Sequence, residues 1–125
     1  MTSTLLVVDD SKSSRKVNLA LLRELVGDSA QYLEASGGQE ALGLLAERPV
    51  DLVLLDLTMP VVSGFDVLAE LQRRAFKAPV VVVSADIQKQ AQERVAALGA
   101  AAFIAKPIQL DALRAALTQG GVLHG

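Results

Sequence analysis

The sequence contains no cysteine and no tryptophan, and only 3% of its residues are aromatic. Without cysteine, disulfide bonds, thiolate metal ligands and thiol nucleophiles are all excluded. No apolar run approaches the ~20 residues of a membrane-spanning helix, and the opening residues lack the basic region and cleavage site of a secretory signal. We therefore expect a cytoplasmic location and no membrane partner.

The chain also has little net charge, formally -2, and a pI near 5.3. Binders of nucleic acid usually carry a clustered basic surface, so we expect no nucleic-acid partner. A length of 125 residues, 51% of them hydrophobic, is enough for one core and too short for a receptor plus an effector domain. We expect one domain over residues 1–119 and a flexible tail over 120–125. His124, the only histidine, lies in that tail, and we expect no catalytic role for it.

Short apolar, β-branched runs alternate along the chain with segments of helical periodicity. The runs predict strands at residues 4–8, 31–35, 53–55, 80–83 and 101–105. The periodic segments predict helices at residues 12–26, 39–47, 65–74, 87–98 and 110–117. Strict alternation favours an α/β fold with a parallel sheet and right-handed crossovers. We expect a flavodoxin-like doubly wound (βα)5 sheet with strand order 2-1-3-4-5.

In the first and fourth predicted helices, the apolar spacing marks the face that we expect to be buried. In the first helix the apolar stripe consists of Val17, Leu21, Leu22, Leu25 and Val26. The basic side chains Arg15, Lys16 and Arg23 can then face water. In the fourth helix the corresponding stripe consists of Ile87, Ala91, Val95 and Leu98.

Acidic residues follow two of the predicted strands: Asp9 and Asp10 the first, and Asp56 the third. In the expected order these strands are neighbours, and the carboxyl edge of such a sheet is where ligands bind. Three carboxylates in one place would repel each other unless a cation neutralised them. An all-oxygen site without His or Cys suits Mg²⁺ better than zinc. The sequence therefore predicts a magnesium site.

Two further polar residues follow the fourth and fifth strands, the hydroxyl of Ser84 and the ammonium of Lys106. These groups can hold a phosphoryl group beside a metal ion. Phosphoryl transfer needs mainly positioning and charge neutralisation, so Asp56 could attack phosphorus in line. The product would be an aspartyl phosphate.

The motifs at the strand ends, in this order, resemble a response-regulator receiver domain of the stand-alone, chemotaxis-regulator type. They are Asp9-Asp10, Asp56 with Met59-Pro60 and Gly64, Ser84-Ala85, and Phe103 with Lys106-Pro107. The resemblance covers nearly the whole chain. It implies a single-domain regulator of a two-component phosphorelay, phosphorylated on Asp56 with Mg²⁺ by a phosphohistidine donor. Such a protein assists its own phosphorylation and dephosphorylation and is not a turnover enzyme.

The resemblance also implies a role for each residue of the site. Asp56 would be the phosphoacceptor, and the metal ligands would be Asp10, Asp56, the backbone carbonyl of Thr58 and, through water, Asp9. Ser84 and Lys106 would bind the phosphoryl oxygens, supported by Ala85 and Pro107. The peptide bond before Pro107 is usually cis in this family.

In this family a switch couples the hydroxyl residue to an aromatic residue, here Ser84 and Phe103. Phosphorylation would then reshape the face formed by the fourth helix, fifth strand and fifth helix, where a downstream protein binds. The implied upstream partner is a histidine kinase or histidine phosphotransfer protein, and the chain would be a monomer or a phosphorylation-dependent dimer. The pattern departs from the family at Ser63, where Asp is common, at Ser84, where Thr is commoner, and at Phe103, where Tyr is frequent.

Three alternatives remain open. The chain could be a receiver-like interaction module that is never phosphorylated. A haloacid-dehalogenase-like phosphatase also uses an aspartate nucleophile and Mg²⁺, but it carries a second Asp two residues later, where this chain has Thr58. A flavodoxin-like flavin binder would need a phosphate-cradling loop after the first strand, where this chain has two acids.

Overall fold

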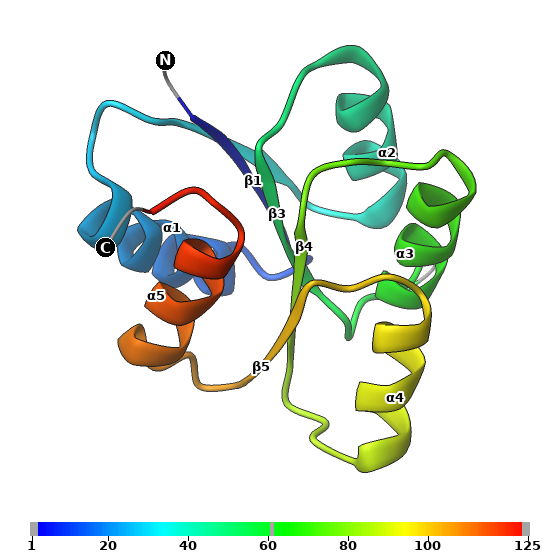
Figure 1. Cartoon of the computed structure of the whole chain (residues 1–125). Coiled ribbons are helices and arrows are strands. Elements are labelled where there is room, and N and C mark those ends of the chain that lie inside the picture. Colours follow the sequence, from blue (N-terminus) through cyan, green and yellow to red (C-terminus); the bar gives the residue numbers. More distant parts are fainter. Residues whose placement is uncertain (1–2, 61, 124–125) are drawn as a thin grey trace.

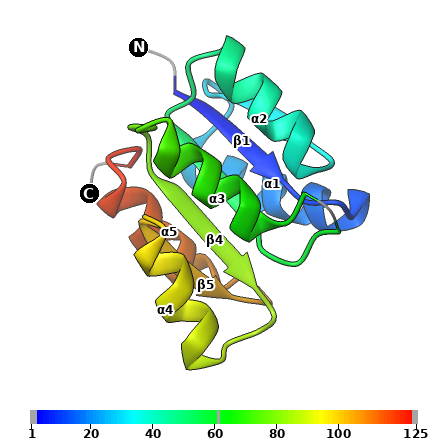
Figure 2. The ribbon, with the colours of Figure 1, turned by 90° about the vertical axis from the view of Figure 1, so that its right-hand side faces the viewer.

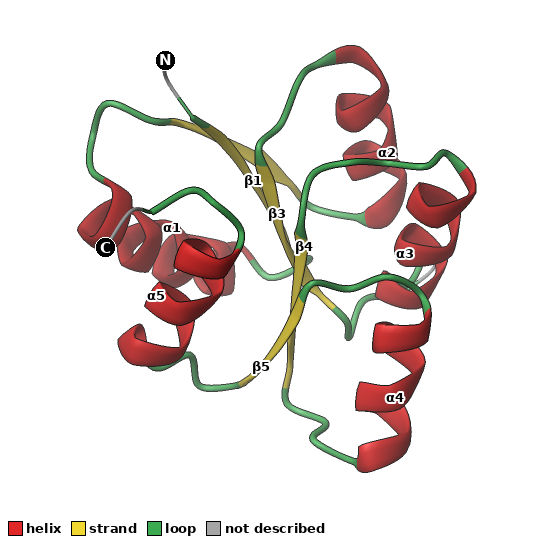
Figure 3. Ribbon diagram, in the orientation of Figure 1, coloured by secondary structure: helices red, strands yellow, loops and turns green. Residues whose placement is uncertain are grey.

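Strands and helices alternate strictly in the computed structural model, which describes residues 3–60 and 62–123 (Figure 1, Figure 3). The strands are β1 Thr4–Val8, β2 Gln31–Ala35, β3 Leu52–Asp56, β4 Val80–Ser84 and β5 Ala102–Ala105. The helices are α1 Lys12–Val26, α2 Gly38–Glu47, α3 Gly64–Arg73, α4 Lys89–Ala97 and α5 Leu110–Gln119. Every predicted element is present, and its ends agree with the prediction to within two residues.

All strand pairs are parallel, and the strand order is β2-β1-β3-β4-β5. Helices α1 and α5 cover one face of the sheet, and α2, α3 and α4 cover the other (Figure 1, Figure 2). The predicted flavodoxin-like fold and strand order are therefore confirmed. Among the described residues no helix is both long and apolar enough to cross a bilayer.

Side chains of the strands alternate between two hydrophobic clusters, one on each face, because successive residues of a strand point to opposite sides. On β3, Val53 and Leu55 join the cluster under α2, α3 and α4, whereas Leu52 and Leu54 join the cluster under α1 and α5. Both faces of the central strands are thus buried, as the unbroken apolar runs predict for a parallel sheet.

Pairing between strands brings their carboxyl ends level. Val8 pairs with Leu55, and Asp56 pairs with Val83. Ser84 pairs with Ala105, the last residue of β5. Polar residues at or just after these strand ends therefore meet at one edge of the sheet.

The buried side of α1 differs from the predicted stripe. Its buried residues are Asn18, Leu19 and Leu22, and Val17 is 58% exposed. Leu21, Leu25 and Val26 pack only partly against the cluster under this helix. Leu19, Leu22 and Val26 also follow helical spacing, at i, i+3 and i+7, so periodicity alone left two possible rotations of the helix.

The predicted start of α4 is also wrong. Ile87 is 62% exposed and precedes the helix, which begins at Lys89. Hydrogen bonds hold the preceding loop in a turn: Asp86 N–H donates to Ser84 Oγ, and Gln88 N–H donates to Asp86 Oδ1. The buried face of α4 is formed by Ala91 and Val95, as expected.

The chain continues after α5 into a packed turn. Val122 and Leu123 donate backbone hydrogen bonds to the carbonyl of Leu117, and both side chains pack against the α1/α5 cluster. The flexibility expected for residues 120–125 stays a prediction. His124 lies outside the described residues.

Candidate functional site

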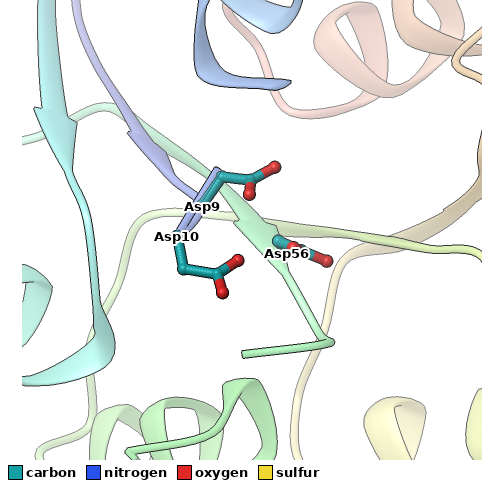
Figure 4. Close-up of side chains that lie close together, drawn as sticks. All are labelled: Asp9, Asp10 and Asp56. Atoms are coloured by element: carbon teal, nitrogen blue, oxygen red, sulfur yellow. The ribbon is translucent and has the colours of Figure 1, made fainter. Parts of the chain in front are cut away.

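Three carboxylates meet at the carboxyl edge of the sheet, as the strand order predicts. Asp9 and Asp10 extend from the end of β1, and Asp56 extends from the end of the neighbouring strand β3 (Figure 4). One oxygen from each carboxylate lies within 4.8 Å of the other two. Asp9 and Asp56 are buried and Asp10 is exposed, so the cluster is open to solvent on one side.

The start of α1 holds Asp9 in place. Ser11, the N-cap of the helix, donates its backbone N–H to Asp9 Oδ1 at 2.9 Å, and its side chain accepts from Ser14 N–H. The backbone N–H of Asp9 donates to the carbonyl of Ala35 on β2. The second carboxylate oxygen, Oδ2, is buried and accepts no hydrogen bond. A buried polar atom without a hydrogen-bond partner is rare in a folded protein, so this oxygen is free to bind a further ligand.

Asp56 ends β3, and a turn fixes its carboxylate. Oδ1 accepts a hydrogen bond of 3.1 Å from the backbone N–H of Thr58, and the N–H of Leu57 donates to the carbonyl of Val83. Burial raises the pKa of Asp56, and the charge of Asp9 raises it further. The Thr58 N–H and the Lys106 ammonium lower this pKa but do not outweigh the burial. An opposing positive charge would therefore bind favourably here.

Lys106 supplies the cation nearest to these acids among the described residues. Its Nζ lies 3.4 Å from Asp56 Oδ1 and 3.8 Å from Asp9 Oδ2. The backbone N–H of Lys106 donates to the carbonyl of Ser84, which fixes the chain at the end of β5. The Lys106–Pro107 peptide bond is cis, as the family resemblance predicts.

Ser84 lies at the end of β4, and its hydroxyl is fully buried. Its Oγ accepts the N–H of Asp86 and makes no hydrogen bond to the three acids. Phe103 pairs with Val82 across β4 and β5, so Ser84 and Phe103 point to the same face of the sheet, the one that α4 covers. Phe103 is half-buried there, and Ala85 is exposed beside the site.

Gly64 begins α3 directly behind Asp56. A Cβ atom at this position would lie 2.7 Å from Leu57 Cα and 2.9 Å from the carbonyl oxygen of Asp56. Both contacts are with backbone atoms, and moving these atoms would disturb β3 and the turn that follows it. The lack of a side chain therefore lets α3 approach the strand that carries Asp56. Ser63 caps this helix through a capping box with Asp66.

One residue at this edge was missed at the level of sequence. Arg15, expected to face water, is only 14% exposed, and its Nη1 donates a hydrogen bond of 2.7 Å to the backbone carbonyl of Asp9. Its Nε donates to Glu34 on β2. The signal that could have identified it is its place one turn after the N-cap Ser11, because helix side chains lean toward the N-terminus.

The acidic cluster fits a hard divalent cation by two criteria. Its ligand atoms are all oxygens, the set that Mg²⁺ prefers. The carboxylate of Asp9 also has a buried oxygen, Oδ2, that accepts no hydrogen bond. The structure brings Asp9, Asp10, Asp56 and Lys106 together. The Ser84 hydroxyl makes no hydrogen bond to the side chains of these four residues. A metal-binding role for the Thr58 carbonyl stays a prediction.

Comparisons with known proteins agree with this geometry. The family model of the response regulator receiver domain matches residues 5–118. The polar-differentiation response regulator DivK of Brucella abortus is 34% identical over 113 residues, which cover 88% of this chain and 89% of DivK. A probable cyclic di-GMP phosphodiesterase of Vibrio cholerae is 30% identical over 113 residues, and this chain spans 25% of its length.

Among solved structures, the chemotaxis protein CheY4 of Vibrio cholerae superposes with a TM-score of 0.85 over 96% of this chain and 99% of CheY4. The sequence identity is 23%, so this likeness supports the fold alone. The family match leaves the haloacid-dehalogenase-like alternative without support. The family model matches residues 5–118, which include the three acids of the cluster and Lys106. The chain therefore belongs to the response-regulator receiver domains of two-component signalling.

Proposed function

We propose that this chain is a single-domain response regulator that is phosphorylated on Asp56 by a histidine kinase or histidine phosphotransfer protein. The observation that carries the proposal is the convergence of Asp56, Asp9 and Lys106 at one edge of the sheet. A buried carboxylate beside a second carboxylate and an ammonium suits phosphoryl transfer, which depends on positioning and charge neutralisation. The similarity to DivK over nearly its whole length supports a one-domain regulator.

In this reaction an oxygen of Asp56 attacks the phosphorus of a phosphohistidine. The new P–O bond forms as the P–N bond breaks, and the electron pair of that bond leaves with the imidazole nitrogen. Asp56 Oδ1 is held by the Thr58 N–H and lies beside Lys106, and these contacts orient the carboxylate. Lys106 would neutralise charge on the transferred oxygens. Asp10, Asp56, the Thr58 carbonyl and, through water, Asp9 would hold Mg²⁺, which supplies further neutralisation of phosphoryl charge.

The proposed response begins at Ser84 and Phe103. The Ser84 hydroxyl would leave its bond with the Asp86 N–H and turn to a phosphoryl oxygen, and Phe103, which lies on the same face, would move with it. The affected surface would be formed by α4, β5 and α5, where a downstream protein would bind. Ala85 and Pro107 support the two phosphoryl-binding residues, and the chain would not turn over a substrate.

A mass measurement tests the phosphoacceptor directly. The chain is incubated with acetyl phosphate and Mg²⁺, and its intact mass is measured for wild type, D56N and D111N. Asp111 is an exposed acid on α5 and serves as the control. The expected result is one phosphoryl group on wild type and D111N and none on D56N. An unmodified wild type would contradict the proposal and favour an interaction module that is never phosphorylated.

A further inference from the structure

The guanidinium of Arg15 joins three parts of the fold: α1, β2 and the acidic residues that follow β1. Nη1 donates to the Asp9 carbonyl at 2.7 Å, and Nε donates to Glu34 Oε1 at 3.1 Å. The Arg15 side chain is 14% exposed, whereas that of Glu34 is 49% exposed. The guanidinium reaches the two acceptors with two different nitrogens held in one rigid plane, whereas a lysine has a single nitrogen.

The position of the bonded carbonyl matters, because it belongs to the peptide that joins Asp9 to Asp10. The N–H of Asp9 is bound to Ala35, and its Oδ1 accepts from Ser11. Because Arg15 donates to the Asp9 carbonyl, both the N–H and the C=O of Asp9 are hydrogen-bonded. Asp10 itself is exposed, so packing does little to fix its carboxylate. The direction in which Asp10 extends therefore depends on the plane of the peptide that Arg15 holds.

We propose that Arg15 is a positioning residue of the metal site. By fixing the Asp9–Asp10 peptide it keeps the Asp10 carboxylate within reach of the oxygens of Asp9 and Asp56. This inference rests on the proposed metal-dependent function, and it assigns a residue outside the acidic cluster to that site. Partners that orient metal ligands commonly change metal affinity by about 10–100-fold when they are removed.

A purely electrostatic role and a purely structural role for Arg15 would each give a different result. If only its positive charge mattered, its removal would tighten Mg²⁺ binding, because like charges repel. If it only clamped α1 to β2, its removal would lower stability without changing Mg²⁺ affinity. The chain contains a matched control for the clamp: Arg23, also on α1, lies over the ring of Tyr32 on β2 at 4.9 Å from the ring centroid.

The test is calorimetric titration of Mg²⁺ into the full, unphosphorylated chain, with the Tm of each variant measured in parallel. R15A is expected to weaken Mg²⁺ binding about 10-fold. R23A is expected to lower the Tm and leave the Kd for Mg²⁺ unchanged. R15K is expected to bind with intermediate affinity, because its single nitrogen can replace the bond to the Asp9 carbonyl but lacks the rigid plane that also holds a second nitrogen at Glu34.

The outcomes separate the inference from the proposed function. If wild type binds no Mg²⁺, both are overturned. If wild type binds Mg²⁺ and R15A binds it equally or more tightly, the inference alone is overturned. If R15A and R23A weaken Mg²⁺ binding equally, the inference is also overturned, because a general loss of packing between α1 and β2 would then be the cause. If R15A fails to fold, R15K serves as the test variant. Mg²⁺ binding by R15K as tight as that of wild type would then contradict the inference.

Discussion

The Lys106 ammonium lies 3.4 Å from Asp56 Oδ1 and is the internal counter-ion of the acidic cluster. A divalent cation held by the same carboxylates would compete with this ammonium for their charge. The relationship between Lys106 and Asp56 therefore links the stability of the metal-free chain to its affinity for Mg²⁺.

The first prediction concerns K106M. Without Mg²⁺, this change should lower the free energy of unfolding by about 1–3 kcal/mol, because two buried carboxylates lose their nearest cation. The same change should tighten Mg²⁺ binding, since the ion no longer competes with an ammonium. Urea unfolding and calorimetric titration measure the two effects. The control is K89M, because Lys89 and its partner Glu93, 3.7 Å away, are both exposed. K89M should change the free energy of unfolding by less than about 0.5 kcal/mol.

The second prediction concerns the pH dependence of D56N. Burial and the charge of Asp9 raise the pKa of Asp56 above its ordinary value of 3.8, so the folded state holds this proton to higher pH than the unfolded state. Folding is therefore penalised progressively as the pH rises from 3.8 through the folded pKa. D56N removes the penalty and should raise the Tm of the metal-free chain at neutral pH by about 2–8 °C.

Thermal unfolding of wild type and D56N between acid and neutral pH, without Mg²⁺, measures this effect. The advantage of D56N should be absent at low pH and should grow as the pH rises. An advantage that does not change with pH would mean that the charge of Asp56 is not its cause.

The third prediction compares two glycines. G64A should lower the free energy of unfolding by about 1–3 kcal/mol, because the new methyl would meet the backbone of Asp56 and Leu57 at under 3 Å. G43A, within α2, meets nothing within 4 Å and should raise stability by about 0.5–1 kcal/mol. Urea unfolding of both variants tests this, and a neutral G64A would show that α3 can shift away from β3.

The fourth prediction concerns Glu70 on α3. Hydrogen bonds from Arg73 and Arg74 lower the pKa of Glu70 to about 2. The contribution of the ionised Glu70 to stability should be complete above pH 4.5 and should be lost as the pH falls toward about 2. Carbon NMR of the side-chain carboxylate measures the titration. Because these groups lie at the surface, high salt should raise the pKa toward 4.5, and a titration near 4.5 at low salt would contradict the prediction.

The acidic cluster could be predicted because two simple rules determine it. Strand ends were visible as apolar runs that stop at Asp9 and Asp56, and the order of the strands made those ends neighbours. The position of Lys106 followed in the same way from the end of β5. Such residues are predictable because the backbone carries them to the site, whatever their side chains contact.

The role of Arg15 and the exposure of Val17 could not be predicted in this way. Both depend on how α1 is rotated about its axis, and the apolar spacing of this helix allowed two neighbouring rotations. The fact that selects between them is the packing of Leu19 and Leu22 against the sheet, a tertiary contact. The start of α4 was missed for a related reason, since local hydrogen bonds of Asp86 extend the loop past Ile87.

The alternation of the strands gives the site a geometric property of its own. Asp56 continues the series Leu52 and Leu54, which face α1 and α5, whereas Ser84 continues the series Val80 and Val82, which face the opposite layer. The sheet separates these layers along its whole length. A phosphoryl group bonded to Asp56 and held by Ser84 would therefore bridge the two helical layers around the rim of the sheet. Information could pass from one layer to the other there without any change in the pairing of the strands.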